Sequence, residues 1–197
     1  IDATLNIEDK SVGISQQINY TNLGKERTNI LYLQDWINAY RDTKTPLAKR
    51  FSEDFNRKFY LSSKSKLGLT QIDTIKGIDN SLEWNRIEKQ PDIIKVVLSK
   101  FLEPGETTTL LLSYLIKIPD SKFTGMGIND DGRVYLNHWN ISIAPIIKGS
   151  WLLTSNLDLN DYSGNPANYK ITWHYPKNYF LNTNLLETET TIDTVNK

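Results

Sequence analysis

The chain has 197 residues, which is enough for one large β domain with a substantial core. Its 23 Lys and Arg residues balance 23 Asp and Glu residues, so we expect no contact with nucleic acid or with a membrane. The lack of cysteine excludes disulfides, thiolate nucleophiles and Cys-ligated zinc, and no run approaches the roughly 18 apolar residues that cross a bilayer. Because it starts at Ile1 rather than methionine, the chain is expected to be part of a longer protein.

Two stretches of alternating apolar and polar residues open the chain. They cover residues 3–7 and 12–20 and are separated by a polar turn at Asp9 and Lys10. Alternation with a period of two around such a turn predicts a β-hairpin. Residues 29–38 follow as a third predicted strand, with apolar side chains on both faces that indicate a covered strand.

The hydrophobic spacing changes after the third predicted strand. Thr45 offers an N-cap hydroxyl, and Pro46 suits the first position of a helix. Leu47, Phe51 and Phe55 then recur every four residues with charged residues between them. This pattern predicts one helix of about 14 residues whose apolar stripe packs on a sheet edge or a partner domain.

Four further strands are predicted after the helix. Residues 69–75, 81–87, 93–98 and 107–118 are rich in apolar and β-branched side chains. Residues 103–106 place proline and glycine as a tight turn requires, so the last two strands are expected to form a hairpin. The aliphatic content of the last strand favours a central position in its sheet.

The most unusual polar residues lie in the stretch from 114 to 145. It leaves a strand at Pro119, passes three glycines, turns at residues 129–132 and returns as a predicted aromatic strand over residues 135–140. The turn begins like a calcium loop but lacks the alternating ligand spacing and the closing glutamate, so a hairpin turn is the better interpretation. The glycines do not lead from a strand into a helix, which argues against a phosphate cradle.

The remaining elements are predicted near the end of the chain. Residues 150–154 and 169–175 read as strands, residues 162–168 as a surface loop, and residues 187–197 as an edge strand or a frayed terminus. About ten strands with one inserted helix and no β-α-β alternation predict a mainly all-β fold. We expect one domain over residues 1–197, built as an antiparallel β-sandwich or as saddle-like open sheets with one inserted α-helix.

No catalytic or metal-binding motif is complete in the sequence. A hydrolytic zinc site takes three His, Asp or Glu ligands, whereas the chain has only His138 and His174, both in strand patterns. There is no nucleophile elbow, and no spacing nominates a pair of carboxylates. We therefore expect no catalytic residue and no metal ligand in this chain, and a packed or surface role for each histidine.

The aromatic residues have two interpretations. Five tryptophans and ten tyrosines could line a sugar-binding surface or fill the core of a sandwich. All five tryptophans lie in or beside strand patterns, which favours core packing. Glycosylation sequons begin at Asn19 and Asn140, but both fall inside predicted strands, so glycan attachment is not expected.

Several segments together resemble a known family. They are the hairpin that ends in residues 19–22, the segment 35–59, the segment 102–119, and the strand 169–176 followed by Asn178 and Tyr179. Their order resembles the N-terminal domain of the aminopeptidase N-like (gluzincin) zinc metallopeptidases, and is closest to a divergent bacterial branch. The similarity covers nearly the whole chain.

The resemblance implies a β saddle that packs on a separate thermolysin-like domain. That catalytic domain of the same polypeptide would hold the zinc, so no cofactor is expected in this chain, and the full-length protein would take a peptide substrate. In the family a strand near the end of the N-terminal domain reaches the cleft with a Glu or Gln. By position it resembles residues 135–140, so His138, Trp139 and Asn140 are the substrate-cleft candidates, although none of them carries a carboxylate.

The leading functional hypothesis is therefore a non-catalytic N-terminal domain of an aminopeptidase-like zinc hydrolase. The domain would form part of the substrate cleft, and the isolated chain would hydrolyse nothing. The alternative is a free-standing surface β-sandwich that binds carbohydrate or protein. The sequence does not indicate where the parent protein resides, and it is compatible with a periplasmic, cell-surface or membrane-associated location.

Overall fold

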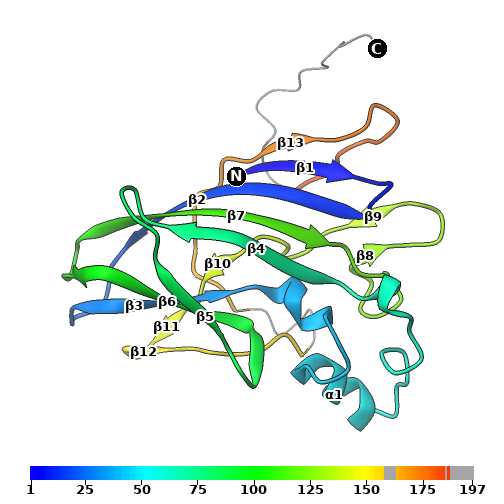
Figure 1. The fold of residues 1–197 in the computed structure, drawn as a ribbon, viewed down its shortest axis with the longest axis horizontal. Helices are drawn as coiled ribbons and strands as arrows, with labels where there is room; N and C mark the ends of the chain where they lie inside the picture. The colour runs from blue at the N-terminus through cyan, green and yellow to red at the C-terminus, as the bar shows by residue number, and fades with distance from the viewer. Residues whose placement is uncertain (158–162, 185, 187–197) are drawn as a thin grey trace.

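Two β-sheets form the framework of the chain in the computed structural model, which describes residues 1–157, 163–184 and 186 (Figure 1). The larger sheet contains β1 (Asp2–Asn6), β2 (Ser11–Thr21), β4 (Leu69–Lys76), β7 (Thr107–Lys117) and β13 (Thr172–His174). The smaller contains β3 (Thr28–Gln34), β5 (Glu83–Ile87), β6 (Gln90–Leu102) and β10 (Ser142–Ile143). Two short pairs join β8 (Gly127–Ile128) to β9 (Val134–Tyr135) and β11 (Ile146–Ile147) to β12 (Ser150–Trp151).

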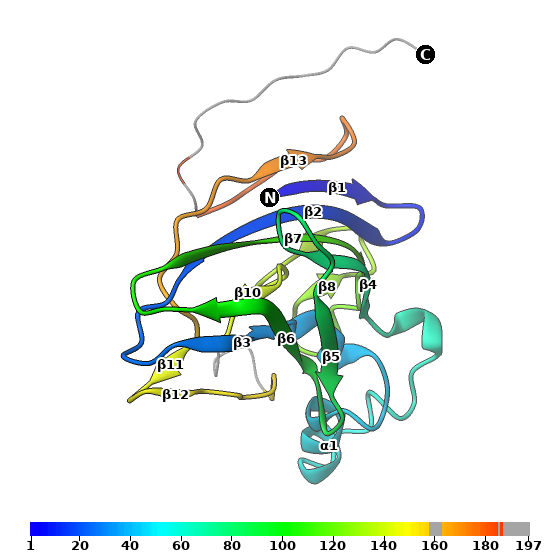
Figure 2. The ribbon, with the colours of Figure 1, turned by 60° about the vertical axis from the view of Figure 1, so that its left-hand side comes forward.

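The strand orders are β13-β1-β2-β7-β4 and β10-β3-β6-β5. Among the described residues, all named pairs are antiparallel except β1 with β13, which is parallel. The predicted all-β, mainly antiparallel fold is confirmed. In the turned view, β13, β1 and β2 form a layer above β3 and β6 (Figure 2).

The core fills the space between the two sheets. The smaller sheet buries alternate residues of β3 and β6, and the larger sheet does the same along β2 and β7. The fully buried side chains with the largest volumes include Tyr40, Tyr114, Leu31, Leu33, Ile94, Leu110 and Ile116. Each such aliphatic side chain stabilises the fold by about 1.5–3 kcal/mol relative to exposure. The tryptophans also serve the core, because Trp36 and Trp139 are buried and the other three are half-buried against it.

The predicted N-terminal hairpin is confirmed. β1 and β2 pair from Asp2 with Ser15 to Asn6 with Ser11, and the turn closes with a hydrogen bond from Lys10 N to Ile7 O of 3.2 Å. β2 then pairs with β7 along its whole length. Since β7 lies between β2 and β4, its predicted central position is also confirmed.

The predicted hairpin between β6 and β7 is wrong. The turn at Glu103 to Glu106 is present, with Gly105 at φ +82°, but β6 pairs with β3 and β5 whereas β7 pairs with β2 and β4. The turn therefore carries the chain from one sheet to the other. Hydrogen bonds of 2.8 Å from Gly105 N to Asn22 O and of 2.9 Å from Asn22 N to Glu106 O hold this crossing at the end of β2.

The third predicted strand ends earlier than expected. β3 stops at Gln34, and the rest of the predicted range belongs to the 3₁₀ helix η1 (Trp36–Tyr40). The change occurs at Asp35, whose amide donates to Asp92 O at 2.8 Å and whose carbonyl accepts from Asn38 N at 3.0 Å. All five residues of η1 are buried, which explains why this segment is as apolar as a covered strand.

The predicted helix is present but shorter. α1 (Pro46–Glu53) has eight residues, and the Thr45 hydroxyl accepts from Ala48 N at 3.2 Å as its N-cap. Leu47 and Phe51 are buried as predicted. The expectation that Phe55 continues the helix is wrong, because α1 ends at Glu53 and Phe55 has a left-handed backbone. Its side chain is 94% exposed and therefore does not pack on a sheet of this chain. A further single turn, η2 (Lys64–Lys66), precedes β4.

The predicted strand over residues 135–140 is also wrong. The hairpin turn at residues 129–132 is confirmed by hydrogen bonds from Asn129 N to Arg133 O and from Gly132 N to Asn129 O, both 3.1 Å. Its second strand, β9, ends at Tyr135. The connection to β10 that follows contains no strand, and at its end the backbone of Ile141 bonds to side chains of the larger sheet.

The last predicted elements are shorter than expected. Strand structure covers only Ser150–Trp151 of residues 150–154 and only Thr172–His174 of residues 169–175. Residues 164–168 of the predicted surface loop are exposed. The predicted tail over residues 187–197 lies outside the described residues.

Candidate functional site

The candidates His138, Trp139 and Asn140 lie on the connection between β9 and β10. The next residue, Ile141, is fixed to the larger sheet, since its amide donates to the Tyr114 hydroxyl at 3.1 Å and its carbonyl accepts from Gln16 Nε2 at 2.8 Å. The Tyr114 hydroxyl donates in turn to Gln16 Oε1 at 2.5 Å. Burial raises the pKa of Tyr114, so its phenol remains the proton donor that this network needs.

The backbone of His138 adopts a left-handed conformation, with φ at +49°. Its ring meets the buried Trp36 ring edge-on, with the centroids 5.5 Å apart. Burial lowers the pKa of His138, so the imidazole is neutral at pH 7. A neutral imidazole can accept or donate a hydrogen bond at a cleft wall.

Trp139 and Asn140 have more restricted roles. Trp139 is 9% exposed and packs on Trp173 of β13, with the ring centroids 4.7 Å apart, so its side chain belongs to the core. The Asn140 amide donates to the carbonyl of the adjacent Ile141 at 3.2 Å and is part-buried. The structure therefore leaves His138 and Asn140 as the partly accessible members of the predicted set.

The second histidine lies on β13, away from the connection in sequence. His174 Nε2 is 3.4 Å from Asp2 Oδ2, and both side chains are exposed. Within the described residues, no group of three or more His, Asp or Glu side chains is placed to hold a metal ion.

A buried ionic cluster, which sequence reasoning missed, joins the two sheets at η1. Asp35 is 1% exposed, and its carboxylate accepts from Arg86 Nη2 of β5 at 2.7 Å and from the Thr70 hydroxyl of β4 at 2.7 Å. Arg86 also donates to Pro91 O at 2.7 Å. The only signal in the sequence is an aspartate within the apolar run 30–40, which does not reveal its partners.

Asp92 lies beside this cluster with no exposed surface. Its two oxygens accept from Asn156 N at 2.7 Å and from the Ser155 hydroxyl at 3.0 Å. Burial raises the pKa of Asp92 to about 6, against the opposing effect of these two donors. A carboxyl with such a pKa can act as a general base. Here both oxygens are occupied by the chain itself, so the role of Asp92 is to fasten residues 155–156 to β6.

The outer face of the larger sheet carries a shallow open depression of about 520 Å³. Thr4, Gly13, Gln71, Leu69 and Leu115 are among its lining residues. The other lining residues are Asn6, Asp9, Ser11 and Lys117, so most of the lining is uncharged. The depression therefore offers a flat surface rather than a reaction site.

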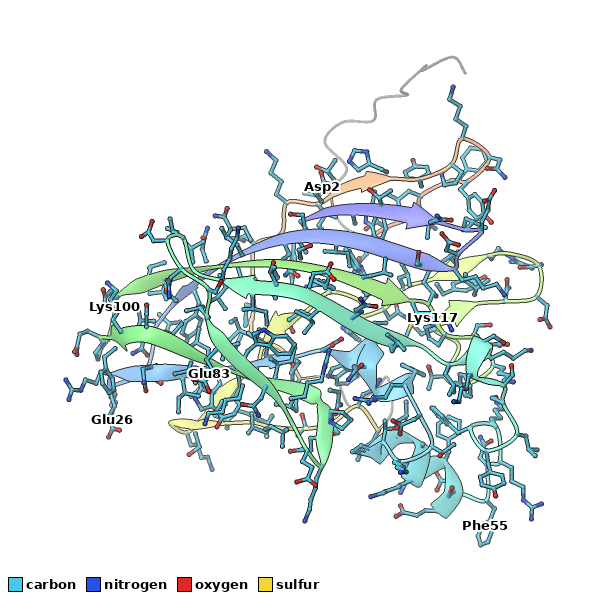
Figure 3. All side chains as sticks on the ribbon, viewed as in Figure 1. Asp2, Glu26, Phe55, Glu83, Lys100 and Lys117 are labelled. Carbon is cyan, nitrogen blue, oxygen red and sulfur yellow. The ribbon has the colours of Figure 1, made fainter. Side chains whose placement is uncertain are left out.

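Three strongly exposed apolar side chains lie close together in sequence between α1 and η2. Phe55 is 94%, Tyr60 80% and Leu61 76% exposed, and we call these three residues the apolar tip. Figure 3 shows Phe55 at the outer corner of the molecule, pointing away from both sheets. Phe59 in the same segment is buried and stacks on Phe123 at 4.4 Å, which anchors the tip.

Comparison of the sequence with known proteins and protein families found no match, since neither a protein-family model nor a curated protein matches the chain. No helix in the described part of the chain is both long and apolar enough to cross a membrane.

Proposed function

We propose that this chain is the non-catalytic N-terminal β domain of a larger aminopeptidase N-like zinc metallopeptidase. It packs on a separate catalytic domain of the same polypeptide and forms part of the cleft that receives a peptide. Zinc and the catalytic residues belong to that separate domain. The resemblance of residues 35–59 and 102–119 to the family supports this proposal.

The observation that carries the proposal is the apolar tip. Scattered exposed apolar residues are normal, but a group that is 76–94% exposed within seven residues is typical of a surface that another protein covers. The anchoring of Phe59 on Phe123 and Phe51 makes the tip a firm part of the fold.

The cleft wall in this proposal is the connection between β9 and β10. His138 presents a neutral, half-buried imidazole, and Asn140 presents a part-buried amide. Neither can pair with a substrate ammonium group as a carboxylate would, so their contribution is hydrogen bonding. Trp139 supports them from the core through its contact with Trp173.

The alternative, a carbohydrate-binding sandwich, receives less support from the aromatic residues. Sugar platforms use exposed aromatic rings, of which tryptophan is the most suitable. All five tryptophans here are buried or half-buried against the core. The observations therefore favour a protein partner.

Hydrolysis assays test the proposal directly. The native polypeptide that contains this chain is expected to bind zinc and to hydrolyse aminoacyl or peptide substrates, and the activity should disappear when zinc is chelated. The isolated chain should show no turnover with or without added zinc. Zinc-dependent turnover by the isolated chain, or a native polypeptide that neither binds zinc nor hydrolyses these substrates, would contradict the proposal.

A further inference from the structure

The end of α1 forms a Schellman motif with an unusual residue at its key position. Asn56 N donates to Phe51 O at 2.7 Å, and Phe55 N donates to Ser52 O at 3.1 Å, which is the double hydrogen bond of this motif. The residue between the helix and Asn56 must be left-handed, and glycine usually fills this place because it has no Cβ. Here Phe55 fills it, with φ at +56°.

Phe55 is therefore unfavourable in the isolated fold for two reasons. A side chain with a Cβ is strained in the left-handed region. In addition, the Phe55 side chain is 94% exposed and so gains almost no stabilisation from burial within this chain. A glycine would end the helix with less strain. Strained residues that the surrounding structure holds in place often mark functional sites, and here the strain directs an aromatic ring outward.

The segment that carries the apolar tip is also strongly basic. Residues 55–66 contain Arg57, Lys58, Lys64 and Lys66 and no acidic residue, although the whole chain has no net charge. Lys66 pairs with Asp120 at 3.1 Å. The other three are exposed, and no ion pair to them is found in the part of the chain that the structure describes.

Hydrogen bonds hold the segment in a defined shape. Leu61 N donates to Arg57 O at 2.9 Å, and the Ser62 hydroxyl donates to Lys58 O at 2.5 Å. These bonds close a turn that contains the exposed side chains of Tyr60 and Leu61 next to Arg57 and Lys58 in the sequence. A preorganised group of this kind loses little conformational entropy on binding.

We infer that the apolar tip, together with the basic residues Arg57, Lys58 and Lys64, forms a docking surface for a protein domain. That domain presents an apolar pocket edged with Asp and Glu side chains. This inference rests on the proposed function, because that partner is the adjacent domain of the same polypeptide. Phe55 and Tyr60 fill the pocket, and Arg57, Lys58 and Lys64 face the carboxylates. Aromatic and Arg side chains at the centre of a contact are the residues that carry most binding energy between proteins.

The charge count favours a protein over a lipid surface. Basic clusters that recognise anionic lipids usually contain about four to eight Lys and Arg residues. Asp120 neutralises Lys66, so residues 55–66 offer three cations to a partner, namely Arg57, Lys58 and Lys64. Three cations are fewer than such lipid-binding clusters usually contain, which favours a protein partner over an extended anionic surface.

The stability of the chain tests the first step of the inference. Replacing Phe55→Gly should raise the Tm of the isolated chain by about 2–3 °C, because the strain is relieved and no contact within the chain is lost. Lys148→Gly is the matched control, since Lys148 also has a left-handed backbone, with φ at +52°, in the exposed turn between β11 and β12. It should give a similar rise. A lower Tm for Phe55→Gly would show that the ring packs within this chain, and would overturn the inference.

Cross-linking tests the partner itself. A carbodiimide joins a lysine amine to a carboxylate only where the two are in contact. In the native polypeptide, mass spectrometry should find amide links from Lys58 or Lys64 to Asp or Glu residues outside residues 1–197. Their yield should fall at least about fivefold in Phe55→Gly and stay unchanged in Lys148→Gly. The inference is overturned if these links are absent, if they survive Phe55→Gly, or if they join two copies of this chain.

Two further readouts separate the alternatives. Sedimentation of the chain with phosphatidylserine–phosphatidylcholine vesicles that is lost in Phe55→Gly would assign the tip to a lipid surface and overturn the inference.

Zinc content and hydrolysis are measured on the same cross-linked sample. Links from the tip in an inactive, zinc-free polypeptide would uphold the docking surface and refute the metallopeptidase, whereas an active zinc enzyme without the links would do the reverse.

Discussion

At the scale of single residues, buried charge is the most demanding feature of this chain. Asp35 loses its hydration on folding, and in the described part of the chain its carboxylate accepts hydrogen bonds from Arg86 and Thr70 instead, each at 2.7 Å. Such a pair contributes little net stability compared with an apolar replacement of both partners, but removal of one partner leaves the other uncompensated. The desolvation of Asp92, next to Asp35, is offset by hydrogen bonds from Ser155 and Asn156 rather than by a cation.

Asp35→Asn is expected to lower the free energy of unfolding by about 3 kcal/mol, because Arg86 then remains largely buried without its counter-charge. The side chain of Arg86 is only 16% exposed, so water cannot replace the carboxylate. Urea denaturation at pH 7 measures the change. The exposed pair of Asp131 and Arg133 provides the control, and Asp131→Asn should leave stability nearly unchanged. Equal stability of Asp35→Asn and the wild type would refute a structural role for the cluster.

Asp92 predicts a pH dependence of a definite sign. The pKa of its carboxyl is about 6 in the folded chain, above the ordinary 3.8, so the folded state holds the proton more tightly. Its contribution to stability is complete below about pH 4 and is lost as the pH rises through 6, with a total of about 3 kcal/mol. Urea denaturation from pH 4 to pH 7 should therefore show wild-type stability falling relative to Asp92→Asn. A constant difference between the two proteins over this range would contradict this assignment.

These buried residues show where sequence reasoning ends at this scale. The pattern around Asp35 correctly indicated a buried segment, because apolar residues surround it on both sides. Its contacts with Arg86 and Thr70 depend on where β5 and β4 lie relative to η1, and nothing local in the sequence contains that information. His138 was predicted to be a substrate-cleft residue, and nothing local in the sequence indicated its left-handed backbone.

At the scale of elements, local chemistry determined what could be predicted. The alternation in β1 and β2 and the capping pair Thr45 and Pro46 act over a few residues, and both predictions are confirmed. The turn at Glu103 to Glu106 was also predicted, but its strands belong to different sheets. Strand pairing depends on which faces are buried together, and both β6 and β7 are apolar enough to pair with several partners. The predicted helix length was wrong, because the spacing of apolar residues cannot show that the backbone of Phe55 is left-handed.

The N-cap of α1 gives a prediction at this scale. Thr45 is 1% exposed, and its hydroxyl accepts from Ala48 N at 3.2 Å and donates to Ala39 O at 2.7 Å. Thr45→Ala should lower the free energy of unfolding by about 1–2 kcal/mol, because the helix loses its cap and a buried carbonyl loses its donor.

Ser63→Ala is the matched control for this prediction. Ser63 precedes η2 in the same extended conformation, but its side chain makes no capping hydrogen bond. Chemical denaturation should show little change for this variant. A similar loss of stability in Thr45→Ala and Ser63→Ala would show that the cap is not the cause.

At the scale of the whole molecule, the two joined sheets form the framework, and the exposed apolar tip lies outside it. The two sheets are joined by their common core, by the ionic cluster at Asp35, and by Ile141, which bonds to the larger sheet before β10 joins the smaller. Phe55 of the apolar tip projects from one corner of this framework (Figure 3). This arrangement is consistent with the proposal that another domain binds the exposed Phe55.

Amide hydrogen exchange tests this account most directly, because it compares the isolated chain with the native polypeptide that contains it. We predict that exchange at residues 56–62 is slower in the native polypeptide by at least about tenfold, since a covering domain must leave before these turns can open. Residues 14–18 of β2, inside the larger sheet, should exchange alike in both and serve as the internal reference. Identical exchange of residues 56–62 in the two proteins would contradict the proposal that another domain covers the apolar tip.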